Sequence, residues 1–475
     1  MRLDSRVRVA DDGSALFAPW GRVMRLSSAE QAMLDEDTVE VVDNESSRLA
    51  RHLLDVEFAH PRPLKGPSWS DLTVVIAARD EPELVQQLVA NLPDLPVIVV
   101  DDGSAVPLTC SGATIVRHEH RCGVAEARNT GLRAAHTPFV VFLDPGVVPG
   151  PLWVEAMLAH FADPDVALVV PRIAPLPHRK RWIGQYEAMR PTLDPGRREC
   201  SLHKRKWDYS VPTTALMVRR QAVVKVGGFD GAFPAFNATD MCVRLAQNGW
   251  RLRFDPVAVM RAPAPASVRR WFEWRAASGY GSARVYATKA RPRRLQAATK
   301  LWLLLGSVLL LVGARRAAVI SAAVGVVHTV RLARELPREV HPWVTAAAFN
   351  ASSWSGSVRR VAEVALRNLW PLTLLAAVVS PRVRTVVIVA ALAEGAADWW
   401  SRRDAEVRID LVRFVLLRRL DDIAFGWGLW RGFAEVRYGA SGYSGLRNDA
   451  GVVPVHLLNA RRNALDSENP SVVAM

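Results

Sequence analysis

The sequence predicts an α/β protein organised around a doubly wound parallel sheet, and three observations favour this fold. Short apolar runs alternate with helical patterns between residues 72 and 143, an order typical of such a sheet. The run at 97–100 is apolar without alternation, as in a parallel strand buried on both faces. The connections between the runs are short, which indicates one compact domain.

Each expected element follows from its own residues. Strands are expected where β-branched and other apolar residues follow one another, at 72–76, 97–100, 114–116 and 139–143. The first helix is expected at 83–92, because Leu84, Leu88 and Leu92 fall on one face. The second helix is expected at 123–135 and carries Arg128 and Asn129.

Carboxylates follow two of these strands. Asp101 and Asp102 end one strand just before Gly103, and Asp144 ends another. In an open parallel sheet, ligands bind at the carboxyl ends of the strands. Acids placed there can hold a sugar or a base through hydrogen bonds, or help to hold a cation that masks phosphates. For the Asp-Asp-Gly-Ser stretch alone, a surface Asx turn is an equal alternative.

A small α+β module is expected at 1–65, ahead of the sheet. Two short strands should flank the turn at 11–14, and Ser27 with Glu30 forms a capping-box pattern that opens a helix. A second helix should open at Ser46. The pattern resembles winged-helix domains that recognise precursor peptides, and a purely structural extension is the alternative. The proline-rich stretch that follows predicts a stiff linker.

Five motifs then occur in the order typical of one enzyme family. They are Val-Val-Ile at 74–76, Val-Val-Asp-Asp-Gly-Ser at 99–104, Ala-Arg-Asn-Thr-Gly-Leu at 127–132, Phe-Leu-Asp at 142–144 and Gly-Gly-Phe-Asp at 227–230. Together they resemble inverting family-2 glycosyltransferases with the GT-A fold, a Rossmann-like domain expected here at 66–290. Over nearly its whole length, the chain is similar to the glycosyltransferases of the mycofactocin pathway.

Sugar transfer requires that the nucleoside be gripped, the departing diphosphate be neutralised and the acceptor hydroxyl be deprotonated. The resemblance implies that the nucleotide sugar is bound by Ala77, Arg79, Asp101, Asp102, Arg128, Asn129 and Asp144. An arginine at position 128 would also counter phosphate charge, with a surface ion pair as the alternative. The resemblance further implies contacts to the acceptor or the diphosphate from Gly228, Arg270 and Trp271.

The resemblance also implies a divalent metal, Mg²⁺ or Mn²⁺, at Asp144. The family has Asp-x-Asp at this point, whereas this chain has Asp144-Pro145-Gly146. Because a glycine replaces one carboxylate, we expect the metal to bind weakly or not at all.

The expected catalytic base is replaced as well. The family usually has Glu-Asp-x-Asp after the Gly-Gly-Phe-Asp motif, and this chain has Asn237-Ala238-Thr239-Asp240. Ala238 stands where the base is expected and cannot accept a proton. Asp240 and Asp230 are the candidate substitutes, and a helix-end charge is the alternative role of Asp240.

A third departure lies farther along the chain. Arg261 stands where the family often has a histidine, and the glutamine of the Gln-x-x-Arg-Trp motif is missing before Arg270 and Trp271. This Arg-Trp pair can still stack on or pair with a diphosphate. The alternative is that it begins an amphipathic helix.

The composition points to an anionic partner. The formal net charge is +14, which suits nucleic acid, nucleotide phosphates or an acidic membrane surface. Many arginines lie beside apolar runs and no base-reading motif is present, so a membrane surface is favoured and nucleic acid is not expected. The four isolated cysteines suit a reducing cytosol. The first residues do not form a signal peptide.

A helical, membrane-associated region is expected at 291–450, followed by a flexible tail at 451–475. Apolar stretches at 301–314, 317–330, 369–379 and 386–397 are separated by arginine-containing breaks. Each is shorter than the roughly twenty residues that cross a bilayer. Helical hairpins or interfacial helices on the cytoplasmic face of the cell membrane are therefore expected, with Trp399 and Trp400 as anchors. Buried hairpins of a soluble protein are the alternative.

Two functions remain open from the sequence. The first is a membrane-associated glycosyltransferase that moves a sugar, expected to be glucose, from a nucleotide sugar to a peptide-derived acceptor such as a premycofactocin-like cofactor. The second is a catalytically impaired relative that binds nucleotide or peptide as an assembly partner. Asp102 and Arg128 fit both functions, and Gly146 and Ala238 favour the second. The complete order of the motifs favours the first.

Overall fold

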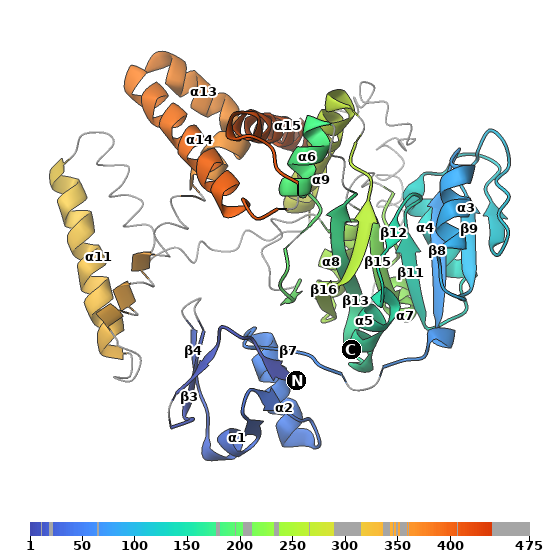
Figure 1. The fold of residues 1–475 in the computed structure, drawn as a ribbon, viewed down its shortest axis with the longest axis horizontal. Helices are drawn as coiled ribbons and strands as arrows, with labels where there is room; N and C mark the ends of the chain where they lie inside the picture. The colour runs from blue at the N-terminus through green and yellow to red at the C-terminus, as the bar shows by residue number, and fades with distance from the viewer. Residues whose placement is uncertain are drawn as a thin grey trace, which may run out of the picture. The chain divides into compact units, whose positions relative to one another are not determined.

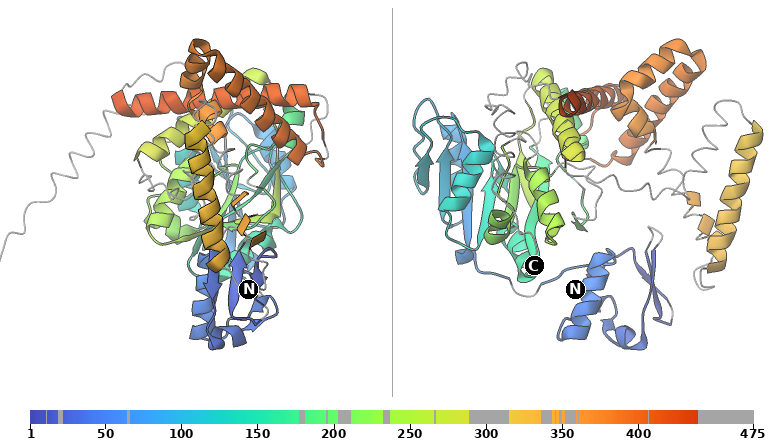
Figure 2. Two further views of the ribbon diagram at one scale, coloured as in Figure 1. Left: turned by 90° about the vertical axis from the view of Figure 1, so that its left-hand side faces the viewer. Right: turned by 180° about the vertical axis from the view of Figure 1, so that it is seen from behind.

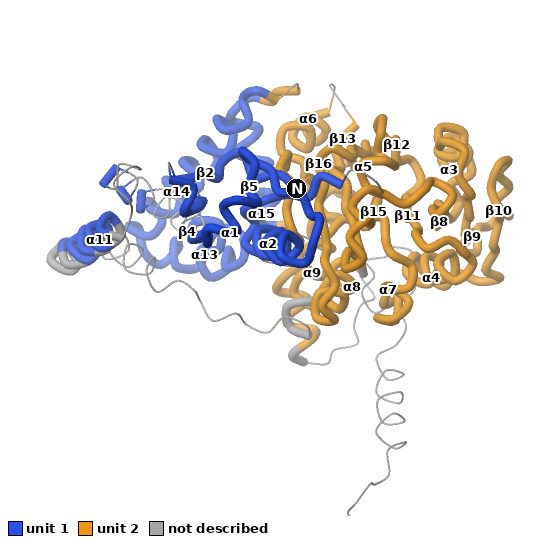
Figure 3. Tube along the Cα trace, turned by 90° about the horizontal axis from the view of Figure 1, so that it is seen from below, with its two compact units in different colours: residues 1–64, 291–404, 410–423 blue, residues 65–290, 405–409, 424–475 orange. Residues whose placement is uncertain are grey.

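The computed structural model describes most of the chain (Figure 1). The described residues are 1–10, 12–18, 22–63, 66–176, 181–194, 196–202, 211–231, 237–265, 267–288, 315–335, 361–405 and 407–438, with a few isolated positions between 343 and 359. Two compact units are distinguished (Figure 3). One comprises residues 1–64, 291–404 and 410–423, and the other 65–290, 405–409 and 424–475. The domain borders expected at 65, 290 and 450 stay predictions, and the tail at 451–475 lies outside the described residues.

A nine-stranded sheet forms the centre of the second unit. Its strand order is β10-β9-β8-β11-β15-β13-β16-β12, and β14 pairs with β16. The strands are β8 (Leu72–Ala78), β9 (Val97–Asp101), β10 (Thr114–Arg117), β11 (Phe139–Leu143), β12 (Val148–Pro149), β13 (Val166–Pro175), β14 (Cys200–Ser201), β15 (Ala215–Arg219) and β16 (Arg251–Ala262).

The first half of this sheet is parallel and the second half is mixed. Strands β10, β9, β8 and β11 run parallel, which confirms the four strands expected there and the Rossmann-like half of a GT-A domain. Strand β15 runs antiparallel to both β11 and β13. The prediction of a parallel sheet, made for residues 72–143, is confirmed, and no strand direction had been predicted beyond β11. Strands buried on both faces show the same apolar run in either direction, so their sequences do not reveal orientation.

Helices cover both faces of the sheet and form two apolar cores. The helices are α3 (Pro82–Ala90), α4 (Val124–Ala134), α5 (Trp153–Ala159), α6 (Trp182–Met189), α7 (Arg220–Lys225), α8 (Asn237–Gln247) and α9 (Val268–Thr288). Alternate residues of β8 face opposite ways, as a strand requires. Val74 packs with residues of α3 and α5, and Val75 packs with residues of α4, α7 and α8.

Helix α15 (Leu411–Tyr438) crosses α9 at very short range over its second half. A Cβ added at Gly428 would overlap the carbonyl oxygen of Ala276, and one added at Gly279 would overlap that of Phe425. The Tyr280 hydroxyl donates a 2.7 Å hydrogen bond to Glu435. Burial, together with this carboxylate, raises the pKa of Tyr280 to about 12. The glycines therefore permit a contact that larger residues would prevent.

The N-terminal part of the first unit contains two small sheets and two helices. Its elements are β1 (Arg2–Leu3), β2 (Arg8–Val9), β3 (Ala15–Ala18), β4 (Arg22–Arg25), α1 (Ser28–Ala32), β5 (Leu34–Asp35), β6 (Thr38–Val39), α2 (Asn44–Asp55) and β7 (Ala59–His60). The capping box of Ser27 and Glu30 is confirmed. The second helix begins earlier than expected, because Asp43 is its N-cap. The winged-helix likeness stays a prediction.

Three further helices belong to the first unit: α11 (Arg315–Glu335), α13 (Trp370–Val379) and α14 (Pro381–Ser401). The apolar stretch expected at 301–314 lies outside the described residues. Among the helices described, no single one is long and apolar enough to cross a membrane. One pair bent by 92°, Val361–Asn368 with Trp370–Val379, meets the length and composition required.

We predict that Gly428→Ala destabilises the contact between α9 and α15. The added methyl group has no room beside the Ala276 carbonyl, and overpacking of this kind costs about 1–3 kcal/mol. Thermal unfolding measures the loss. The matched control is Gly231→Ala, because nothing lies within 4 Å of a Cβ at that position. Equal unfolding temperatures for the two variants would contradict the prediction.

Candidate functional site

The candidate site lies at one edge of the sheet, where the neighbouring strands β9, β8 and β11 end. These ends carry Asp101 and Asp102, Ala77 to Glu81, and Asp144. Because the three strands run parallel, their carboxyl ends meet at the same edge, where such sheets bind ligands. The structure therefore brings together the predicted residues of three separate motifs.

Asp101 organises the loop that follows β9. Its side chain is fully buried, and it accepts hydrogen bonds from the amides of Ser104 (2.9 Å) and Leu108 (3.1 Å) and from Arg117. Burial alone would raise the pKa of this carboxyl, but the hydrogen bonds lower it overall. In this conformation no part of the Asp101 side chain reaches the surface, and its predicted contact with a nucleotide stays a prediction.

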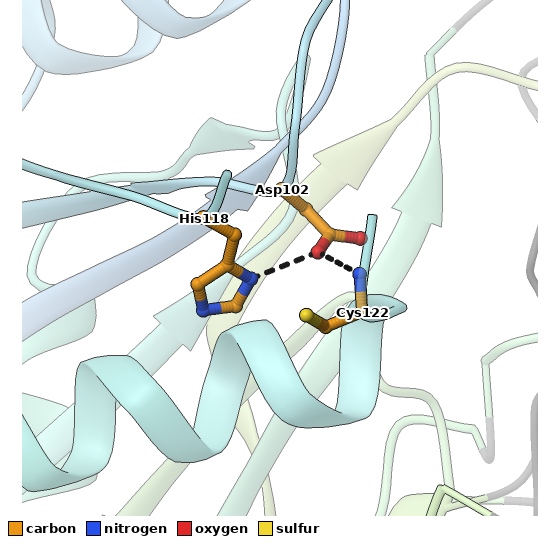
Figure 4. A group of neighbouring side chains, drawn as sticks. All are labelled: Asp102, His118 and Cys122. Atoms are coloured by element: carbon orange, nitrogen blue, oxygen red, sulfur yellow. Dashed lines mark hydrogen bonds and ion pairs between the residues drawn. The ribbon is translucent and has the colours of Figure 1, made fainter. Parts of the chain in front are cut away.

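Asp102 organises the next loop, which leads into α4 (Figure 4). One carboxylate oxygen accepts from the Cys122 amide at 2.8 Å and lies 3.0 Å from Nδ1 of His118. The other accepts from the Gly123 amide at 2.8 Å. Asp102 is only 5% exposed. Its predicted nucleoside contact stays a prediction, while its observed contacts shape the wall of the site.

Asp102, His118 and Cys122 also form a possible cation site by distance, because they offer donor atoms within 4.8 Å of one another. The chemistry does not fit a metal. Both ring nitrogens of His118 already have partners, at Asp102 and at Oγ1 of Thr130. Partial burial, and then the charges of Asp102 and Glu126, raise the pKa of the Cys122 thiol, which disfavours the thiolate that metals require. The cluster instead fixes the loop between β10 and α4.

The loops after β8 and β9 are joined to each other. Asp80 adopts a left-handed backbone with φ of 55°, its amide donates to the Ser104 hydroxyl at 2.9 Å, and its carboxylate accepts from the Ala105 amide at 2.8 Å. Arg79 lies 3.4 Å from the Asp80 carboxylate and is partly exposed. Two hydrogen bonds therefore link the loops, and Arg79 is partly exposed beside them.

Arg128 holds Asp144 in place. Its Nη2 donates to the Asp144 carboxylate at 2.6 Å and to the Thr213 carbonyl at 3.2 Å, and its guanidinium lies 5.6 Å from the centre of the Phe229 ring. Arg128 is 3% exposed, whereas the Asp144 side chain is 32% exposed. The predicted direct contact of Arg128 with phosphate stays a prediction, and the contact that the structure shows is with Asp144. The arginine acts on a ligand by positioning Asp144.

Glu81 is a further acid at this edge. Partial burial, and then the negative charges of Asp144 and Asp80, raise the pKa of the Glu81 carboxyl. The three carboxylates are therefore close enough to repel one another. Carboxylate oxygens are the ligands that Mg²⁺ and similar hard cations prefer, and a bound cation would relieve this repulsion. Three acids thus lie at this edge of the sheet, although among the described residues they do not form a group with donor atoms within 4.8 Å of one another.

Gly146 has a structural role of its own. Asp144, Pro145, Gly146 and Val147 form a turn in which the Val147 amide donates to the Asp144 carbonyl at 3.3 Å. Gly146 has φ of +79°, the conformation that favours glycine at the third position of such a turn. An aspartate at this position would strain the turn that presents Asp144.

Asn129 and Gly228 contact each other, and their predicted ligand contacts stay predictions. The Asn129 side chain donates to the Phe229 carbonyl at 2.9 Å and accepts from the Phe229 amide at 2.8 Å. Gly228 has φ of +70°, and a Cβ there would overlap the Asn129 amide. These two residues, predicted for the nucleotide sugar and the acceptor, therefore join the Gly-Gly-Phe-Asp loop to α4.

Asp240 reaches the same loop through Arg244. It is fully buried and pairs with Arg244 at 2.8 Å. Arg244 also donates to the carbonyls of Val226 and, at 2.6 Å, Gly228. Asp240 thus fixes the arginine that holds the loop, and its predicted catalytic role stays untested. Ala238 is fully buried in an apolar core, so a carboxylate placed there would first have to overcome burial.

Trp271 packs in the interior. It is fully buried, and its indole nitrogen donates to Glu187 of α6 at 2.7 Å. Its ring meets the Tyr186 ring edge-on at 5.8 Å between centroids. The ring of Trp271 has no exposed face in this conformation, and its predicted contact with a diphosphate stays a prediction. Arg261 and Arg270 are exposed, and Asp230 is half-buried directly after Phe229.

The sequence analysis missed Glu81 and Arg244. Glu81 follows β8 at the edge where ligands bind, so the rule that selected Asp144 could have found it. Arg244 lies four residues after Asp240, a spacing at which helical residues meet. No local sequence pattern indicates the roles of Glu187 and His118, because the residues that they contact are distant in the sequence.

Known proteins share both the motifs and the overall sequence. The model of the family "Glycosyl transferase family 2" matches residues 73–227. The pre-mycofactocin glycosyltransferase of Mycobacterium tuberculosis is 38% identical over 451 residues, covering 92% of this chain and 95% of the relative. The validoxylamine A glucosyltransferase of Streptomyces hygroscopicus subsp. jinggangensis is 35% identical over 119 residues, covering 21% of this chain and 27% of the relative.

A solved structure shows a weaker likeness. A mannosyltransferase of Pyrobaculum calidifontis, in complex with GDP-Man and Mn²⁺, has a TM-score of 0.36 and 17% identity, covering 65% of this chain and 94% of that chain. This likeness is too weak to support a conclusion about the site.

We predict that Glu81→Gln weakens the Mn²⁺-dependent binding of a nucleoside diphosphate on the order of tenfold, by removing a metal ligand or its close partner. Because the pKa of Glu81 is raised, its carboxylate becomes protonated at a higher pH than an ordinary glutamate. As the pH falls, wild-type binding should therefore begin to decline at a higher pH than an ordinary glutamate would allow, and the variant should lack this contribution of Glu81 to the decline. Calorimetric titration measures both effects. Glu83→Gln, an exposed acid on the first turn of α3, is the control and should behave as wild type.

Proposed function

Because the chain belongs to glycosyl transferase family 2, we propose that it transfers a hexose, for which we propose glucose, from a nucleotide sugar to a peptide-derived acceptor of the mycofactocin pathway. The acceptor class rests on the relative that is 38% identical over most of both chains. The observation that carries the proposal is the exposed Asp144 carboxylate, held by the buried Arg128 at the carboxyl ends of parallel strands.

The nucleotide sugar would lie over the ends of β8, β9 and β11. The loop shaped by Asp101 and the loop shaped by Asp102 form one wall of this edge. Asp144 and Glu81 follow the carboxyl ends of β11 and β8, and we propose that the diphosphate lies at this edge. We propose that they hold a divalent cation, Mg²⁺ or Mn²⁺, which would neutralise the negative charge of the departing diphosphate.

The acceptor side would be formed by the loop at 227–231. Asn129 and Arg244 fix the backbone of this loop, and Asp230 follows its anchored Phe229. We propose Asp230 as the group that takes the proton of the acceptor hydroxyl, in an inverting transfer. Asp240 is less suited to this role, because it is fully buried and paired with Arg244.

The alternative function is a nucleotide- or peptide-binding assembly partner without transfer activity. Ala238 favours this alternative, because the family position of the base lies in an apolar core. The carboxylates of Glu81 and Asp144 favour the enzyme, because they restore the charge that Gly146 does not supply.

We predict sugar transfer when the purified protein is incubated with Mn²⁺, a mycofactocin precursor peptide and a panel of sugar nucleotides that includes UDP-glucose and GDP-mannose. Mass spectrometry of the peptide should show the addition of one or more hexoses. Asp230→Asn should lower the rate about a hundred- to ten-thousand-fold, the usual effect of removing a general base.

The matched control is Asp94→Asn, because Asp94 is an exposed acid just before β9, at the opposite end of the strand. This variant should retain full activity. Binding of the sugar nucleotide without any product would support the assembly partner and contradict the proposed enzyme.

A further inference from the structure

In the helix pair formed by α13 and α14, large apolar side chains are exposed and acidic side chains are buried. This is the reverse of the arrangement in an ordinary soluble protein. The two helices lie side by side in both views of Figures 1 and 2 and meet at Ser380, which caps α14. Their exposed large side chains are almost all apolar: Leu372, Leu374, Leu375, Val378, Val379, Val383, Ile388, Val389, Leu392 and Trp400. A contiguous apolar surface of this kind marks an interaction site.

The acidic side chains of α14 lie on its inner side. Glu394 and Asp398 are 8% and 1% exposed, and they face Arg418 of α15, which is itself 2% exposed. Arg418 donates to Glu394 at 3.1 Å and lies 3.7 Å from Asp398. A Cβ added at Gly395 would come within 2.9 Å of Val415, so the two helices are closely packed at this point.

This ion cluster extends to further residues. Arg418 also pairs with Asp422, and Arg419 pairs with Glu394 and with Asp422. Arg402 and Arg359 reach Asp398 at 3.0 and 3.2 Å. A buried charge is tolerated only when it is paired. The pairing allows α14 to keep every acid away from its outer face, which therefore carries no carboxylate.

We propose that the outer face of α13 and α14 docks into one leaflet of a lipid bilayer that contains anionic head groups. Three features favour lipid over a protein groove. The exposed apolar residues of α13, which include Leu372 as well as Leu374, Leu375, Val378 and Val379, spread over roughly half of the helix circumference. A groove takes the narrower stripe of an amphipathic helix, so this broad face favours lipid.

Charges at both ends of α14 provide the second feature. Arg382 and Arg384 lie exposed at its start, and Arg402 and Arg403 follow its end. Arginines at this separation can reach head groups while the apolar residues between them contact acyl chains.

The Trp399–Trp400 pair supplies the third feature. The Arg403 guanidinium lies 4.9 Å from the Trp400 ring, and aromatic residues beside arginine are typical of the membrane interface.

The test is flotation of the full-length protein with vesicles of equal parts phosphatidylcholine and phosphatidylglycerol. The wild type should float with these vesicles. A triple variant, Leu375→Glu with Val378→Glu and Leu392→Glu, should bind on the order of a hundredfold less, because three exposed apolar contacts are lost. The control triple variant is Val42→Glu, Val106→Glu and Val257→Glu, which alters equally exposed valines elsewhere and should float as the wild type does.

Arg382→Gln with Arg384→Gln should lower binding about tenfold, only to the anionic vesicles and only at low salt. Two results would overturn the proposal: a wild type that stays out of the lipid fraction, or a leucine-valine variant that floats equally well. Sedimentation of the protein without lipid tests the alternative occupant of this face, which is a second copy of the chain. A wild-type dimer that the triple variant converts to monomer, with no vesicle binding, would assign the face to a second copy of the chain. The assay needs no enzymatic readout, so it is independent of the proposed function.

Discussion

The buried ion pair between Arg128 and Asp144 is the constraint on which the candidate site depends. An arginine that is 3% exposed is costly unless its charge and its hydrogen bonds are satisfied. Asp144, the Thr213 carbonyl and the face of Phe229 satisfy them. This requirement joins α4, the end of β11 and the Gly-Gly-Phe-Asp loop, and it leaves Asp144 as a partly exposed carboxylate at the edge of the sheet.

Most polar side chains of the family motifs hold the loops at this edge of the sheet in place. Asp101, Asp102 and Asn129 use their polar atoms on backbone groups of the surrounding loops, and Arg244 does the same for Gly228. At this edge, Asp80, Glu81 and Asp144 remain at least partly exposed to solvent. Most side chains of a family motif can thus serve to fix the shape of a loop. Fewer side chains of the motif are then available to contact the ligand.

The sequence predicted the strands and helices of the parallel half well, because long apolar runs and turn residues are local signals. The antiparallel β15 could not be predicted, because its pairing depends on tertiary contacts. The carboxylates at strand ends were found by the same rule that could have found Glu81. Trp271 was misjudged because its partner, Glu187, is distant in the sequence. Burial of Arg128 and Asp101 was likewise not visible, since charged residues in motifs are usually read as ligand contacts.

Anomalous diffraction at the manganese edge, from crystals grown with Mn²⁺ and UDP, tests the central claim most directly. The account predicts a manganese peak bridging the diphosphate and the carboxylate of Asp144, with Glu81 beside it. A diphosphate bound elsewhere, or a manganese peak at Asp102, His118 and Cys122, would contradict it.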